Sequence, residues 1–129
     1  MTQTSYILYR VQEYVNHGVD QINKTAPDVI IDCVCEYYNV QYDDLRVRSR
    51  RLHVLRPRQV LIYLLRKYGR LTFYDIGKMF YRDHSTAITT CQVVENDREH
   101  IPDMDKAITT IERKIRTIQN AINIQKLNA

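Results

Sequence analysis

The chain has 129 residues and a hydrophobic content of 44%, enough for one domain with a buried core. With only three glycines and three prolines, a many-stranded sandwich or barrel is not expected. No apolar stretch approaches the ~18 residues of a membrane span, and the first residues lack a secretion signal. Three cysteines, an odd number without disulfide spacing, favour a reduced cytoplasmic compartment.

Positive charge is concentrated in the middle of the chain. Residues 45–82 contain eleven Lys or Arg and one acid, a net charge of +10, whereas the rest of the chain has eight basic and fourteen acidic residues, a net −6. Such a segment is typical of a protein that binds a polyanion, because each neutralised phosphate releases counterions. The alternative is a solvated basic face without a partner.

Apolar spacing predicts helices along the first half of the chain. A stripe at intervals of three and four residues predicts a helix over residues 5–23. Thr25 is placed to cap a second helix, with Pro27 in its first turn and its end near Tyr38. A turn and a short helix are expected over residues 39–45. The basic stretch 46–51 has no helical periodicity and is expected to be a loop.

The second half of the chain contains clear helix boundaries. Pro57 is expected to open a third helix, Arg58 to Tyr68, which Gly69 would end with a positive φ. Thr72 and Asp75 have the spacing of a capping box and predict a fourth helix ending near Phe80. A connection through residues 81–82 leads to a fifth helix over 83–98. After a break at 101–102, a sixth is predicted over 104–127.

The fourth and fifth helices have the arrangement of a helix-turn-helix. Ile76 and Phe80 are expected to pack against Ile88, Cys91 and Val94. This packing leaves polar side chains at the amino end of the fifth helix, and such groups can contact base edges in a major groove: Asp83, His84, Ser85 and Thr86.

Three segments carry a family resemblance. Arg56-Pro57-Arg58-Gln59, Ile76–Phe80 and Arg82–Ile88 resemble, in this order, the carboxy-terminal DNA-binding domain (domain IV) of the bacterial replication initiator DnaA. The resemblance covers roughly residues 29–98 and implies an all-α, Trp repressor-like helix-turn-helix fold. It also implies binding to short double-stranded sites like the initiator's nine-base-pair boxes.

The resemblance further implies roles for individual residues. The major-groove base readers would be Asp83, His84 and Ser85, and Arg50 of the basic loop would enter the adjacent minor groove. The implied contacts to the DNA backbone are Arg58, Arg66, Thr72, Arg82 and Thr86, together with Arg48 and Arg51 of the basic loop. One residue, Tyr81, stands where the family has two glycine-like residues, so the turn is shorter and bulkier here.

Other chemistry is not expected from this sequence. No G-x-x-x-x-G-K-[S/T] loop is present, so neither nucleotide binding nor an ATPase motor is expected. Asp83, His84 and Ser85 are consecutive on a helix start and cannot form a catalytic triad. Cys33 and Cys35 have no zinc-like spacing to a histidine. We therefore expect no enzyme, no metal and no cofactor.

The expected domains are an amino-terminal helical extension (1–26), the helix-turn-helix domain (27–100) and a carboxy-terminal helix (101–129). The last helix has an a/d seam of isoleucines at 108, 111, 115, 118 and 122. This seam fits packing within one chain or a homodimer through the terminal helices; having few heptads, it favours the dimer only slightly.

The expected function is sequence-specific binding of double-stranded DNA by a nucleoid-associated regulator of replication or transcription. One alternative is a protein-interaction adaptor whose end helices dock partners, the basic face being incidental. RNA binding is a third hypothesis.

Overall fold

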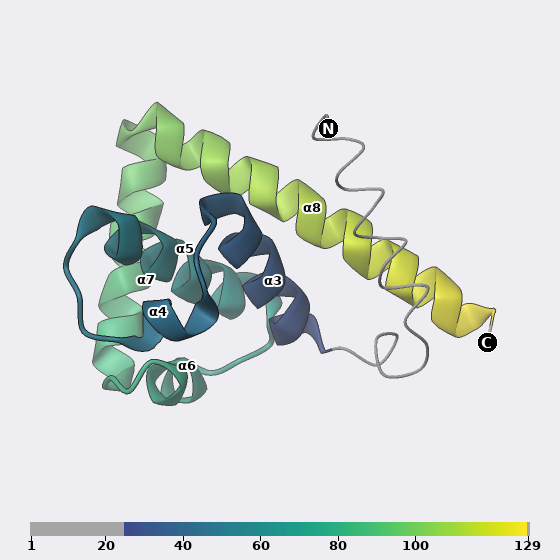
Figure 1. The fold of residues 1–129 in the computed structure, drawn as a ribbon, viewed down its shortest axis with the longest axis horizontal. Helices are drawn as coiled ribbons and strands as arrows, with labels where there is room; N and C mark the ends of the chain where they lie inside the picture. The colour runs from purple at the N-terminus through teal and green to yellow at the C-terminus, as the bar shows by residue number, and fades with distance from the viewer. Residues whose placement is uncertain (1–24, 129) are drawn as a thin grey trace.

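The computed structural model describes residues 25–128, and this part of the chain is all-α, without a strand. It contains six helices: α3 (Ala26–Tyr38), α4 (Tyr42–Arg46), α5 (Leu52–Tyr68), α6 (Phe73–Met79), α7 (His84–His100) and α8 (Pro102–Leu127). Figure 1 shows α8 as a long rod that starts beside the end of α7 and passes along α3. The predicted fold class is confirmed, whereas the helix predicted over 5–23 lies outside the described residues.

The predicted cap at Thr25 and the predicted capping box at Thr72 are both present, and the cap at Thr25 is also a reciprocal box. The Thr25 hydroxyl accepts a hydrogen bond from the Asp28 amide at 3.5 Å, and the Asp28 carboxylate accepts one from the Thr25 amide at 3.2 Å. Thr72 and Asp75 make the same reciprocal pair at 3.0 and 3.1 Å, and α6 begins at the next residue. Local side-chain chemistry therefore sets the starts of α3 and α6.

The start of α5 differs from the prediction. Pro57 does not open the helix but lies inside it, five residues after its first residue Leu52. The first turn is closed by hydrogen bonds from the amides of Val54 and Leu55 to the carbonyl of Arg51, at 3.0 and 2.8 Å. Proline costs the helix one hydrogen bond at this position. Pro57 and Val54 are both buried, and this packing offsets that cost.

The end of α5 also differs from the prediction. Gly69 has a φ of −85°, and the left-handed residue is Arg70, with a φ of 56°. Glycine is needed at 69 for space, because a Cβ there would lie 2.5 Å from the Leu65 carbonyl oxygen. The amide of Gly69 bonds to that same oxygen at 2.9 Å. Close packing on the last turn, and not a positive φ, explains the glycine.

The core is built around α5, which contacts α3, α4, α6 and α7. Residues 60–65 of α5 are all buried, as expected for a helix covered on every side. α8 packs on α3 and α7. All five isoleucines of its predicted seam are buried in the single chain. This burial agrees with packing of the seam within one chain. Self-association through the terminal helices stays a prediction.

Candidate DNA-binding surface

The helix-turn-helix consists of α6, the turn Phe80–Asp83 and α7. The turn is closed by a hydrogen bond of 2.8 Å from the Arg82 amide to the Gly77 carbonyl. A Cβ at Gly77 would lie 2.7 Å from the Arg82 carbonyl oxygen and 3.1 Å from the His84 nitrogen, so only glycine permits this approach. Tyr81 adopts a left-handed φ of 55°, which allows a turn this short.

The predicted base readers of α7 are exposed at its amino end. Asp83 is the N-cap residue, and His84, Ser85 and Thr86 form the first turn. The Asp83 side chain makes no capping hydrogen bond; its Oδ1 lies 2.8 Å from Nδ1 of His84 instead. Helix amide groups and polar side chains are thus presented together at one exposed end, the arrangement by which helix starts bind phosphate.

Asp83 is held in its charged form. Desolvation raises the pKa of Asp83, but the neighbouring His84 and the amide and hydroxyl groups around it outweigh this effect, so the pKa is lowered from its ordinary value. A carboxylate that stays ionised can only accept hydrogen bonds. In a major groove its natural partner is an amino group such as N4 of cytosine.

The basic loop, residues 47–51, is tied to the helices by arginines that donate to its backbone. Arg58 donates to the carbonyls of Val47 and Ser49 at 3.0 and 2.7 Å. Arg82 donates to the Val47 carbonyl at 3.2 Å and to the Phe80 carbonyl at 2.6 Å. These bonds place the loop beside the turn that precedes α7.

Arg58 and Arg82 are more enclosed than a phosphate contact alone requires. Arg58 is only 6% exposed, and Arg82 is half-buried. Burial lowers the pKa of both guanidinium groups, with smaller contributions from Arg82 on Arg58 and from Arg48 on Arg82. Arg58 donates to the loop backbone, and Arg82 donates both to the loop and, at a shorter distance, to the Phe80 carbonyl of the turn. By contrast, the three arginines of the loop itself are exposed: Arg48, Arg50 and Arg51.

An open hollow of about 650 Å³, the basic hollow, lies between the loop and the start of α7. It brings together six of the predicted site residues: Arg48, Arg50, Arg58, Arg82, Asp83 and Thr86. Ser85 lines a smaller adjoining hollow that shares Thr86. Arg50, the candidate for the minor groove, and Asp83, a candidate for the major groove, are 33 positions apart in the sequence. They nevertheless line the same hollow.

Two predicted backbone contacts lie elsewhere, at the link between α5 and α6. Arg66 donates to the Leu71 carbonyl at 2.9 Å and lies over the ring of Phe73, with its Cζ 4.3 Å from the centroid. The Thr72 hydroxyl is used in the α6 cap. Both residues are exposed, but neither lines the basic hollow.

Sequence reasoning missed two residues that line both hollows. Thr90 follows Thr86 by one helical turn and therefore shares its face of α7, a spacing that could have indicated it. Gln59 belongs to the Arg-Pro-Arg-Gln motif, and its side chain reaches both hollows from α5. A glutamine amide can both donate and accept hydrogen bonds at a base edge or a phosphate.

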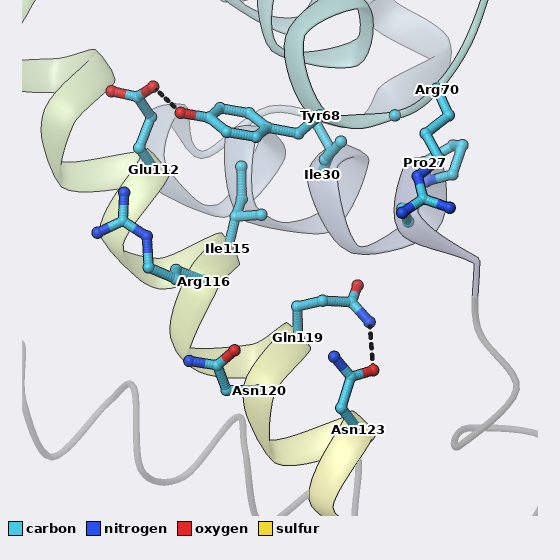
Figure 2. A pocket seen from close by; sticks show the side chains of 12 residues that line it. Pro27, Ile30, Tyr68, Arg70, Glu112, Ile115, Arg116, Gln119, Asn120 and Asn123 are labelled. Atoms are coloured by element: carbon cyan, nitrogen blue, oxygen red, sulfur yellow. Dashed lines mark hydrogen bonds between the residues drawn. The ribbon is translucent and has the colours of Figure 1, made fainter. Parts of the chain in front are cut away.

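A third hollow, the α8-side hollow, has a volume of about 580 Å³ and lies between the start of α3, the residues after α5, and α8 (Figure 2). On its wall the hydroxyl of Tyr68 donates to the Glu112 carboxylate, and the Gln119 amide donates to Asn123 at 3.3 Å. This hollow combines a carboxylate with amides and two arginines, Arg70 and Arg116, and it differs chemically from the basic hollow.

Glu112 is the centre of a polar cluster, the Glu112 cluster, that joins α5, α7 and α8. Its carboxylate lies 2.9 Å from Lys67 Nζ and 3.4 Å from an Arg98 nitrogen, and Arg98 also pairs with Asp105 at 2.9 Å. Desolvation raises the pKa of Glu112, but the Tyr68 hydrogen bond and the Lys67 ion pair outweigh it, so the pKa is lowered. Here each cation has an acidic partner.

Neither metal ligation nor membrane insertion is indicated within residues 25–128. No group of three or more His, Cys, Asp or Glu side chains there could hold a metal ion. None of the described helices combines the length and apolar character needed to cross a bilayer.

Comparison with known proteins agrees with this geometry. A model of the family described as "Bacterial dnaA protein helix-turn-helix" matches residues 27–94. The chromosomal replication initiator protein DnaA of Desulfatibacillum aliphaticivorans is 41% identical over 108 residues, covering 84% of this chain and 24% of the relative. The DnaA protein of Thermoanaerobacter sp. (strain X514) is 30% identical over 109 residues, covering 81% of this chain and 25% of the relative.

The chain thus spans about a quarter of the length of these curated relatives. The matched segment begins in α3 and ends in α7, so it contains the basic loop, the turn and the exposed start of α7. This chain belongs to the bacterial DnaA helix-turn-helix family.

Proposed function

We propose that this chain binds double-stranded DNA in a sequence-dependent manner at sites like the initiator's nine-base-pair boxes. In this proposal the start of α7 enters the major groove, with Asp83, His84 and Ser85 at base edges. Arg50 of the basic loop enters the adjacent minor groove, where negative potential attracts arginine. The observation that carries the proposal is the basic hollow, which both elements line.

The remaining predicted residues divide into two groups. Arg48, Arg51 and Thr86 are exposed, and we assign them to phosphates. Arg48 and Thr86 line the basic hollow, and Arg51 follows Arg50 in the loop. Arg66 and Thr72 would contact phosphates at the start of α6. Arg58 and Arg82 would act mainly by holding the loop, since their guanidinium groups already donate to its carbonyls.

The biological role that we propose is that of a regulator at initiator-type boxes, in replication or in transcription, in association with the nucleoid. The role that we propose for these 129 residues is to read DNA. A homodimer would present two reading surfaces and raise affinity by linkage. Sedimentation over a concentration series would separate the dimer from the monomer.

The central test compares two histidines of the same helix. His84→Ala is expected to cost roughly 1–3 kcal/mol of binding free energy at a box duplex and to reduce discrimination against a scrambled duplex. His100→Ala, a matched change at the opposite end of α7, is expected to leave both unchanged. Fluorescence anisotropy with the two labelled duplexes measures both quantities. Equal discrimination by the His84→Ala variant and the wild type would refute the base-reading role.

A salt series and a selection complete the test. Duplex affinity should fall steeply with salt, because phosphate contacts release counterions; a flat response would favour the adaptor function. Duplex DNA should outcompete duplex RNA, whose deep and narrow major groove side chains cannot read. Selection from random duplexes should enrich box-like sequences, and enrichment of none would contradict the proposal.

A further inference from the structure

The short turn before α7 is held by a side chain from outside the helix-turn-helix. Arg46, the last residue of α4, donates from Nε to the Met79 carbonyl at 2.8 Å and from Nη2 to the Tyr81 hydroxyl at 2.7 Å. Its guanidinium carbon lies 4.7 Å from the centroid of the Tyr81 ring. One arginine therefore contacts both the end of α6 and the turn residue.

Tyr81 needs such support because its backbone is left-handed. A φ of 55° is unfavourable for a residue with a Cβ, and glycine is the residue that adopts it at least cost. Tyr81 is 66% exposed, so core packing does not fix its side chain. The contacts from Arg46 are the interactions that hold the ring and the hydroxyl in place.

The same region contains a second link in the opposite direction. Arg46 immediately precedes the basic loop and reaches the turn, whereas Arg82 belongs to the turn and reaches the loop carbonyl of Val47. Two arginines thus cross-link the loop and the turn reciprocally. Each donor is a charged planar fork, which fixes direction as well as distance.

We propose that Arg46 and Tyr81 are positioning residues that couple the basic loop to the start of α7. The pair sets the spacing between the minor-groove arginine, Arg50, and the base readers of α7, and so contributes to sequence discrimination without itself reading a base. This inference rests on the proposed function. It assigns to Tyr81 the role of holding a turn that is one residue shorter than the family pattern.

The test uses conservative variants that retain charge or ring. Arg46→Lys keeps the positive charge but loses the fork, and Tyr81→Phe keeps the ring but loses the hydroxyl. Each is expected to lower the ratio of scrambled-duplex to box-duplex Kd by roughly fivefold, which corresponds to the net contribution of one ordinary hydrogen bond. The salt dependence of binding should stay unchanged. Arg113→Lys and Tyr37→Phe, on α8 and α3, are the matched controls.

A double variant tests whether the two residues act together. If Arg46 and Tyr81 act as one unit, Tyr81→Phe should change the discrimination between the two duplexes much less in the Arg46→Lys background than in the wild type. Additive effects would overturn the coupling. A lowered melting temperature with unchanged discrimination would also overturn it, because a merely structural role predicts that result.

A measurement without DNA separates this inference from the proposed function. Amide hydrogen exchange should become faster at Arg51 and Arg82 in the Arg46→Lys variant, since their amides bond within the loop and the turn. Unchanged exchange at both amides would overturn the coupling. Failure of the wild type to discriminate between duplexes would refute the proposed function, and the exchange result would then decide the coupling by itself.

Discussion

At the basic hollow arginines donate to backbone carbonyls, whereas in the Glu112 cluster arginine and lysine pair with carboxylates. Arg58 and Arg82 bind the carbonyls of Val47, Ser49 and Phe80. Lys67 and Arg98 bind Glu112 instead, and Arg98 also binds Asp105. A carbonyl carries no net charge, so the first pair keeps its full positive charge, while the second pair is largely neutralised.

The difference shows how one residue type can serve two purposes. Carbonyl partners let buried arginines shape the loop and still contribute to the potential that attracts an anion. Carboxylate partners connect three helices on the α8 side without adding to that potential. The position of positive charge in the sequence is therefore less informative than the partner that each cation finds in the fold.

The largest expected effect is in the Glu112 cluster. Glu112→Ala leaves Lys67, Tyr68 and Arg98 without their shared partner, and it is expected to lower the free energy of unfolding by about 2–4 kcal/mol. Urea unfolding followed by circular dichroism measures it. Duplex affinity of the folded protein should not change, and a specific loss of box binding would show that the Glu112 cluster also serves DNA binding.

Arg58→Ala should come next. The change removes both hydrogen bonds to the loop carbonyls, and we expect a loss of about 2–3 kcal/mol in the free energy of unfolding. Unlike the Glu112 variant, this one should also weaken every duplex, since the loop and one positive charge are lost together. Arg113→Ala on α8 is the control. Wild-type affinity in the Arg58→Ala variant would refute the role given to the loop.

The loss of stability at low pH should depend on the Glu112 cluster. The folded-state pKa of Glu112 is lowered from its ordinary value of 4.5, so its stabilising contribution is complete above that value and is lost as the pH falls through the lower folded pKa. Melting temperatures below pH 4.5 should therefore fall less steeply for Glu112→Gln than for the wild type. Parallel curves would show that Glu112 does not control the acid response.

Arg51→Ala should have the smallest effect. Arg51 is exposed at the end of the basic loop, so its loss should change the free energy of unfolding by no more than about 0.5 kcal/mol. It should still reduce the slope of log affinity against log salt by about 1, if its charge neutralises one phosphate. An unchanged slope would remove Arg51 from the DNA contacts.

Local chemistry made much of this fold predictable. Thr72 and Asp75 lie three positions apart, so their spacing in the sequence predicts their reciprocal bonds. Thr25 is likewise predicted as a cap, but its reciprocal bond with Asp28 is not. The start of α5 was not predictable in this way. The local preference of Pro57 predicts a helix start at this residue, and it takes no account of the burial of Pro57 within the fold.

The same limit applies to the site. Exposure of Asp83, His84 and Ser85 followed from the helix boundary and the apolar face of α7. The partners of Arg58, Arg82 and Arg46 could not be inferred, because each arginine donates to at least one backbone carbonyl oxygen. Every residue carries a carbonyl, so no residue type marks the acceptor. Only the folded path of the loop determines which carbonyls are close enough.

Within residues 25–128, three residues other than glycine have a left-handed backbone, each shortly after a helix ends: Asn39, Arg70 and Tyr81. Such a conformation costs a residue with a Cβ roughly 1–2 kcal/mol. Substitutions that remove this conformational cost are therefore a way to raise the thermal stability of the protein. Arg70→Gly, at a residue that lines the α8-side hollow, would remove part of this conformational cost. It would leave the residues that line the basic hollow unchanged.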